Sequence, residues 1–137
     1  MLVLGITEGS VVSTPEPGTF AKDWLAAWNR HDVEAVLAHF HGDVVFSSPV
    51  AARVVPDSQG VVRGKAALRA YWNAALKTMP ELHFEIVGVY QGESVLVIHY
   101  RNQSGDLVNE VLEFDDGLVR RGHGTYLLDT QPRGRTR

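Results

Sequence analysis

Cysteine is absent from the 137 residues of this sequence. Its absence excludes disulfides, thiol catalysis and metal sites built on cysteine, and it is compatible with a reducing compartment. Long apolar runs are missing as well. The short apolar start MLVLGI follows no basic residue and precedes no long apolar core, so we expect neither a signal peptide nor a membrane-spanning segment. A cytoplasmic protein without a membrane partner is the simplest interpretation.

An excess of positive charge is also lacking. The chain has 13 lysine and arginine residues against 16 acidic ones, a net charge of -3, and its only basic concentration is residues 133–137. Nucleic-acid binding requires clustered basic side chains, so we expect no nucleic-acid partner. With 45% hydrophobic residues, the chain is typical of one soluble globular domain. We expect an irregular leader over residues 1–18, a folded domain over 19–129 and a basic tail over 130–137.

Apolar side chains at helical spacing are concentrated before Pro80. Aromatic residues recur every four positions from Phe20 to Trp28, which predicts an amphipathic helix over residues 19–30. Asp32 can cap a second, short helix. A longer apolar stripe predicts a third helix over residues 64–79, because the proline that follows cannot continue it.

Strand-forming runs dominate the rest of the chain. Residues 44–46 begin a strand that Pro49 ends, and four further runs follow Pro80. These four are separated by Gln91-Gly92, Ser104-Gly105 and Asp116-Gly117, and such short turns imply an antiparallel meander. We therefore predict an α+β domain, in which a curved, mostly antiparallel sheet packs on three N-terminal helices and leaves a cone-shaped cavity.

A carboxyl and an imidazole form the best chemical pair in the predicted sheet. If Asp116-Gly117 is a two-residue turn, Phe114 pairs with Val119, and Glu110 pairs with His123 on the next strand. These two side chains then share a face and can move protons near neutral pH. An even-length loop at Ser104-Gly105 would add His99 to the same face, whereas an odd-length loop would send it to the other side.

The segments WLAAWNRHDVEAVLAHFHGDVVFSSPV and GVVRGKAALRAYW, followed by the meander, resemble the nuclear transport factor 2-like superfamily. The SnoaL-like branch is the closest match. The resemblance implies a cone-shaped α+β barrel, usually a homodimer, with a deep apolar pocket. In such pockets small hydrophobic substrates are cyclised, isomerised, dehydrated or hydrolysed, while other members of the superfamily bind ligands or proteins without catalysis.

The resemblance can be followed residue by residue. The ketosteroid isomerases of this superfamily place an aspartate base before a proline, and that position resembles Ser48, which cannot act as such a base. Their helix-one tyrosine falls on Trp24, and their protonated acid in the penultimate strand falls on Glu110. The SnoaL-like cyclases pair an acid with a histidine on the last two strands, and Glu110 with His123 looks like the reverse order of that pair.

Two hypotheses follow for the function. In the first, a cofactor-independent enzyme acts on a small hydrophobic or cyclic molecule, with His123 as the main proton acceptor or donor and Glu110 as the group that orients it or supplies a second proton. In the second, the domain binds a ligand or dimerises without catalysis, and the same pair only fixes strand register. The side chains predicted to contact a ligand are Trp24, Trp28, Phe46, Ser48, Tyr71, Trp72, Val97, His99 and Leu112.

Neither a metal nor a nucleotide cofactor is expected. His39 and His41 lie two positions apart and point to different sides, which does not match a metal site built on one helix. Gly117, Gly122 and Gly124 do not form a phosphate-binding loop, since no helix follows them.

Overall fold

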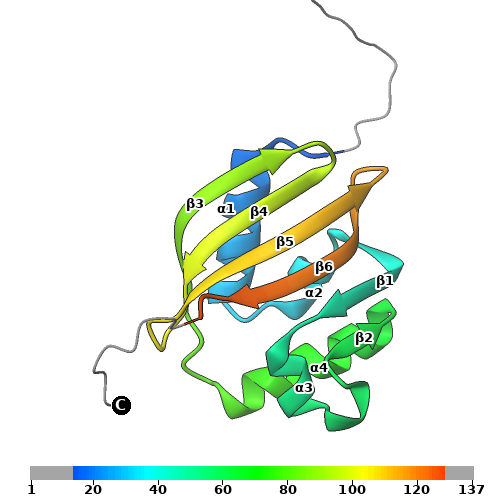
Figure 1. Ribbon diagram of the computed structural model, residues 1–137, viewed down its shortest axis with the longest axis vertical. Helices are drawn as coiled ribbons and strands as arrows, with labels where there is room; N and C mark the ends of the chain where they lie inside the picture. Colours follow the sequence, from blue (N-terminus) through cyan, green and yellow to red (C-terminus); the bar gives the residue numbers. More distant parts are fainter. Residues whose placement is uncertain (1–13, 129–137) are drawn as a thin grey trace, which may run out of the picture.

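Helices early in the chain and strands after them form the two layers of the fold, as the sequence predicts. The computed structural model describes residues 14–128, with helices packed on one face of a curved, open, six-stranded sheet (Figure 1). The helices are α1 (Pro17–Asn29), α2 (Val33–Leu37), α3 (Pro49–Val54) and α4 (Lys65–Thr78), and a short 3-10 turn covers Pro56–Ser58. The strands are β1 (Phe40–Ser47), β2 (Val61–Arg63), β3 (Glu85–Gly92), β4 (Val95–Arg101), β5 (Leu107–Asp115) and β6 (Leu118–Tyr126).

Helix α1 begins two residues before the predicted start. The Glu16 carboxylate accepts the Thr19 backbone N–H at 2.7 Å, and Pro17 occupies the first helical position, where a missing N–H costs nothing. The helix therefore starts inside the segment expected to be an irregular leader. Its far end is attached to the sheet layer, because Asn29 exchanges two hydrogen bonds with the backbone of Phe84 at 2.8 and 3.0 Å.

The segment between α1 and α4 holds more regular structure than predicted. Asp32 caps α2 as expected, accepting the Ala35 N–H at 3.0 Å, but the helix ends at Leu37 and Phe40 already belongs to β1. Pro49 does end that strand, and it begins α3 instead of a loop. The short strand β2 was also not predicted. Both elements are too short to show an apolar period in the sequence.

The sheet order is β2-β1-β6-β5-β4-β3. The predicted meander from β3 to β6 is confirmed, and the α+β class with it. Strand β1 joins this meander by pairing in parallel with β6, while every other pairing is antiparallel. Helix α1 lies behind β3 and β4, so the sheet has an inner face toward the helices and an outer face that none of the helices in residues 14–128 covers (Figure 1).

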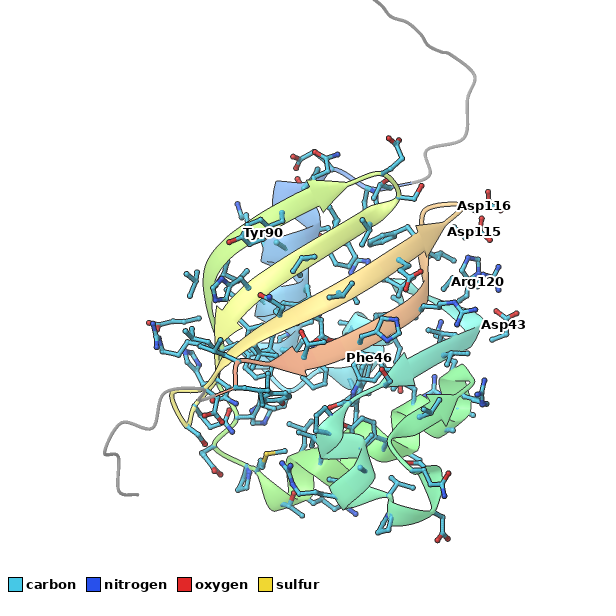
Figure 2. The ribbon with its side chains drawn as sticks, in the orientation of Figure 1. Asp43, Phe46, Tyr90, Asp115, Asp116 and Arg120 are labelled. Carbon is cyan, nitrogen blue, oxygen red and sulfur yellow. The ribbon has the colours of Figure 1, made fainter. Side chains whose placement is uncertain are left out.

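The hairpin between β5 and β6 departs from the predicted register at one residue. Asp116 and Gly117 both have positive φ, 54° and 79°, as a two-residue primed turn requires, and Phe114 pairs with Val119 as predicted. A bulge then inserts Arg120, whose guanidinium forms ion pairs with Asp43 and Asp115 at 2.7 and 2.9 Å (Figure 2).

The bulge reverses the faces of the rest of β6. Glu110 lies opposite Gly124, and His123 lies opposite Val111. The prediction that Glu110 and His123 face each other is therefore wrong, because one extra residue turns every later side chain to the other side of the sheet.

The loop between β4 and β5 covers residues 102–106, five positions, which is the odd-length case. His99 consequently pairs with Asn109 on the outer face, together with Val97. No helix within residues 14–128 has both the length and the apolar character needed to cross a membrane.

Candidate active site

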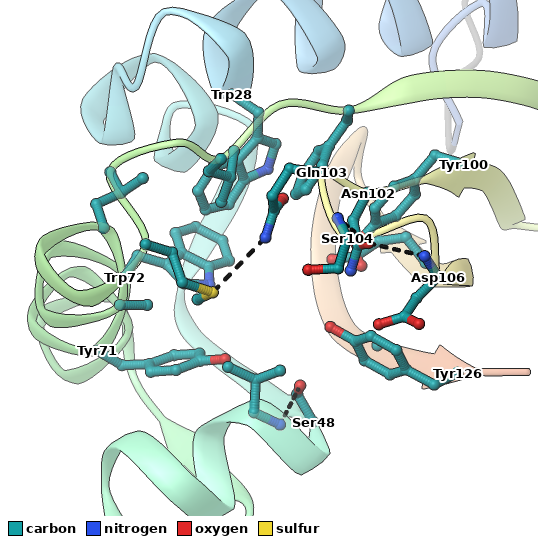
Figure 3. Close-up of a pocket in the computed structure, with 18 of the residues that line it drawn as sticks. Trp28, Ser48, Tyr71, Trp72, Tyr100, Asn102, Gln103, Ser104, Asp106 and Tyr126 are labelled. Carbon is teal, nitrogen blue, oxygen red and sulfur yellow. Dashed lines mark hydrogen bonds between the residues drawn. The ribbon is translucent and has the colours of Figure 1, made fainter. Parts of the chain in front are cut away.

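A cavity of about 150 Å³ lies between the inner face of the sheet and the helices (Figure 3). Its size corresponds to about one benzene-sized ring. The walls are mainly apolar and aromatic, and the buried rings of Trp28 and Trp72 meet edge to face at 4.9 Å between centroids. The aromatic side chains that line the cavity are Trp24, Trp28, Phe46, Tyr71, Trp72, Phe84, Tyr100 and Tyr126.

Glu110 is the only buried carboxyl group among residues 14–128. It projects from the middle of β5 into the cavity, and its neighbours on the inner face of that strand, Val108 and Leu112, are fully buried apolar residues. Burial raises its pKa to about 8, and a hydrogen bond from Tyr100 offsets a part of that rise. The carboxyl group is therefore largely protonated at neutral pH and can still ionise close to it.

Three tyrosines surround this carboxyl group. Burial raises the pKa of Tyr126 to about 12, and it raises the pKa values of Tyr71 and Tyr100 further. All three hydroxyls therefore stay protonated and can donate hydrogen bonds. Figure 3 shows Tyr71 and Tyr126 on opposite sides of the cavity, with their hydroxyls directed into it.

Ser48 and two glycines shape the cavity beside Glu110. The Ser48 hydroxyl caps α3 by accepting the Val50 N–H at 3.0 Å. A Cβ atom on Gly124 would lie 3.4 Å from Ser48 Oγ and 3.7 Å from Glu110 Oε1, so glycine leaves that space open. A Cβ atom on Gly122 would lie 2.7 Å from the Phe46 ring, which packs directly on the backbone of β6.

His123 lies outside this cavity, on the outer face of the sheet. Its Nδ1 is 2.8 Å from Ser47 Oγ on β1, and its Nε2 is 3.0 Å from Glu113 Oε2 on β5. The ring thus connects three neighbouring strands. The prediction that His123 lies beside Glu110 is wrong. The bulge turns His123 to the outer face, where its acidic neighbour is Glu113.

The other residues predicted to contact a ligand also lie on both faces of the sheet. Trp24, Trp28, Phe46, Ser48, Tyr71 and Trp72 line the cavity, as expected. Val97 and His99 lie on the outer face because of the odd loop length, and Leu112 is buried on the inner face without lining the cavity.

Sequence reasoning missed several lining residues. Tyr100 would have been found by assuming the odd loop, because it then alternates inward with Ile98 on β4. An unbulged two-residue hairpin would place Tyr126 on the outer face, and the bulge turns it inward. No pattern in the sequence indicated that Arg53 lines the cavity, since α3 was not predicted.

The mouth of the cavity is polar. Arg53 on α3 and the β4–β5 loop, including Asp106, form its rim. Gln103 reaches across from this loop toward the end of α4, where its Nε2 lies 3.9 Å from the sulfur of Met79 (Figure 3). Within residues 14–128 no three histidine, cysteine or acidic side chains are grouped to hold a metal ion.

The curved open sheet, with the helices on its inner face, defines an α+β cone. The chain belongs to the SnoaL-like domain family, whose sequence profile matches residues 21–122. A SnoaL-like protein of unknown function from Burkholderia thailandensis E264 is 35% identical to it, and the match covers 82% of this chain and 100% of that one with a TM-score of 0.76.

Two more distant structures share the fold. A proposed polyketide cyclase from Sinorhizobium meliloti is 16% identical, with 78% of this chain and 94% of that chain covered and a TM-score of 0.63. A proposed hydroxylase from Streptomyces galilaeus is 20% identical, with 82% and 89% covered and a TM-score of 0.61. At these identities the likeness concerns the fold alone. A comparison with curated proteins finds no match.

Proposed function

We propose that this protein is a cofactor-independent enzyme that transfers protons within a small hydrophobic or cyclic molecule, with Glu110 as its catalytic acid and base. The observation that carries the proposal is a single carboxyl group buried in an aromatic cavity, with its pKa raised to about 8. A catalytic group is most effective when its pKa lies near the working pH. Solved relatives of the same fold that are described as a cyclase and a hydroxylase are compatible with such a role.

The protonated carboxyl group can donate to a ketone or epoxide oxygen, and its ionised form can remove a proton from a neighbouring carbon. The hydroxyls of Tyr71, Tyr100 and Tyr126 supply hydrogen bonds for negative charge that develops on the substrate oxygen. Ser48 adds a fourth hydroxyl at the same end of the cavity. Isomerisation, cyclisation and dehydration use these steps. In epoxide hydrolysis the ionised carboxylate instead removes a proton from a water molecule that attacks the ring carbon, and the ring oxygen that leaves that carbon takes up a proton from a tyrosine hydroxyl. His123 takes no part because it lies on the other face.

Single-ring probes that fit the cavity test this proposal. We expect the protein to accelerate exchange of the α-protons of cyclohexanone in D₂O, followed by NMR, or opening of cyclohexene oxide to the diol. Glu110→Gln should lower the rate by about 10²- to 10⁴-fold, the range typical of general acid–base catalysis. His123→Ala is the matched control and should retain the rate.

The pH profile identifies the form of Glu110 that acts. A rate that rises through pH 8 indicates a base, and one that falls indicates an acid. Full activity in Glu110→Gln, or equal losses in Glu110→Gln and His123→Ala, would contradict the proposal.

The second candidate is a ligand-binding domain without catalysis. It is supported by the position of His123, which leaves the cavity without a histidine among the lining residues that the structure describes. In that case the probes bind, as seen by ligand-detected NMR, and none is converted.

We also propose that the protein forms a homodimer through the outer face of the sheet. No helix covers this face, and it carries Val97, Val111 and the exposed Tyr90 (Figure 2). A second copy would bury these apolar groups. Sedimentation equilibrium should then give twice the mass of the chain, and Val111→Asp should give the mass of one chain.

A further inference from the structure

We propose that Arg53 makes the cavity selective for single-ring molecules that carry a carboxylate, with the ring among the aromatic side chains and the carboxylate at the mouth. The inference deepens the proposed function by naming a substrate class for the same cavity. It rests on that cavity being the binding site, and it is independent of the chemistry that Glu110 performs.

The position of Arg53 supports this role. It lies in the last turn of α3, and among residues 14–128 it is the only lysine or arginine that lines the cavity. Within residues 14–128 its guanidinium forms neither an ion pair nor a side-chain hydrogen bond. Its planar fork of donors is therefore available to a ligand, and that geometry matches a carboxylate in particular.

The charges around the cavity favour an anion over a cation. Two acidic residues line it, Glu110 and Asp106. Glu110 is uncharged when protonated, so it does not repel a carboxylate at the mouth. Burial raises the pKa values of both Tyr71 and Tyr126, and the positive charge of Arg53 opposes that rise at both hydroxyls.

Asp106 has a smaller electrostatic reach into the cavity. Of these two hydroxyls it affects only that of Tyr126, where it raises the pKa by less than Arg53 lowers it. A cationic ligand would meet the guanidinium at the mouth and gain only this weaker partner.

The size of the cavity limits the uncharged part of the ligand. A volume of about 150 Å³ accepts about one ring, and the interior offers a charged group hydroxyls but no cation, since the cationic side chain that lines the cavity, Arg53, lies at the rim. The carboxylate must then remain at the polar rim, where Arg53 lies, while the ring enters. This arrangement predicts a ring joined to a carboxylate directly or through a short spacer.

Matched acids and amides separate charge from shape. We would titrate benzoate, phenylacetate and 3-phenylpropanoate, each beside its primary amide, into the full-length protein at pH 6.5 and follow binding by calorimetry or NMR. We expect at least one acid to bind about five- to tenfold more tightly than its amide, the scale of a partly shielded ion pair.

Two charge variants give opposite predictions for the same acid. Arg53→Met should remove the preference while leaving the affinity for the amide unchanged. Asp106→Asn should increase the affinity for the acid by about two- to threefold, because it removes a repelling charge from the rim. Circular dichroism of both variants checks that the fold is retained.

Equal binding of acid and amide by the natural protein would overturn the inference, as would equal losses for both in Arg53→Met or no binding of any acid. These results are distinguishable from failure of the proposed function. If amides bind and Glu110-dependent turnover of cyclohexanone persists, only the role of Arg53 falls. If acids bind selectively and Glu110→Gln has no effect on turnover, only the catalytic proposal falls.

Discussion

Glu110 and Glu113 lie three residues apart on β5 and point to opposite faces of the sheet. Glu110 is 5% exposed, faces the aromatic cavity and has a pKa raised to about 8 by burial. The Glu113 side chain is 46% exposed and lies 3.0 Å from His123 Nε2. Identical side chains on one strand thus meet different surroundings, because Glu110 faces apolar walls whereas Glu113 faces solvent and an imidazole.

The two faces also use their polar groups for different purposes. On the inner face, hydroxyls surround a carboxyl group that has no charged partner. On the outer face, Ser47, His123 and Glu113 form a hydrogen-bonded row across β1, β6 and β5. His123 thus contacts the strands on both sides of β6, at the position where Ser47 pairs with it in the parallel ladder.

Shifting β6 by one residue should have the largest effect on this division. Inserting one alanine between Arg121 and Gly122 would turn every later side chain of the strand to the other face. His123 would then face the core opposite Glu110, and Gly122 and Gly124 would face outward. Burying the imidazole and losing the close packing of these glycines should cost more than about 4 kcal/mol and abolish cooperative unfolding. Circular dichroism and thermal melting measure the outcome.

Deleting Arg120 is the control for the insertion. It removes the bulge and the exposed ion pairs to Asp43 and Asp115, but it leaves Gly122 and Gly124 with their partners on the inner face, so the protein should still fold. An insertion variant that melts like the natural protein would show that β6 tolerates either register and that the division between faces is not fixed by the pairing of β5 with β6.

The next effect concerns the pH dependence of stability. In the unfolded chain the Glu110 carboxyl group has its ordinary pKa of 4.5, whereas in the native state it has a pKa of about 8. Between these values the native state keeps a proton that the unfolded chain has lost, so rising pH favours unfolding. Stability should fall from about pH 4.5 to about pH 8 and level off above, by a few kcal/mol in total, since one pKa unit corresponds to about 1.4 kcal/mol.

Glu110→Gln should remove this slope, because the amide resembles the protonated acid and cannot ionise. Urea unfolding at pH 5, 7 and 9 would show a variant close to the natural protein at pH 5 and more stable at pH 9. Glu113→Gln is the matched control on the other face and should keep the slope. A slope that survives in Glu110→Gln would mean that this carboxyl group is already ionised in the native state at neutral pH.

Much of the fold could be predicted because its signals are local. The four-residue spacing from Phe20 to Trp28, the apolar stripe of α4 and the Asp116-Gly117 turn each lie within one element. Glu110 could be predicted for a similar reason, since its apolar neighbours at i-2 and i+2 on one strand mark a buried face.

The register of β6 could not be predicted, because its cause is not local. The bulged Arg120 pairs with Asp43, which is 77 positions away in the sequence. The odd length of the β4–β5 loop likewise depends on Asn102. Its side-chain oxygen accepts the Ser104 and Asp106 N–H groups and closes a five-residue turn. The bulge places His123 on the outer face, and the odd loop length places His99 there.

The smallest expected effect is that of His123→Ala. The variant loses hydrogen bonds to Ser47 and Glu113 at a half-exposed site, so it should be destabilised by only about 1 kcal/mol. Binding and turnover of single-ring probes should remain, because no atom of the cavity changes. Chemical denaturation measures the first quantity and the cyclohexanone assay the second. If turnover falls while stability holds, the outer face takes part in the chemistry. Catalysis would then not be confined to the face of the sheet that carries Glu110, and the face that carries Glu113 would contribute to it.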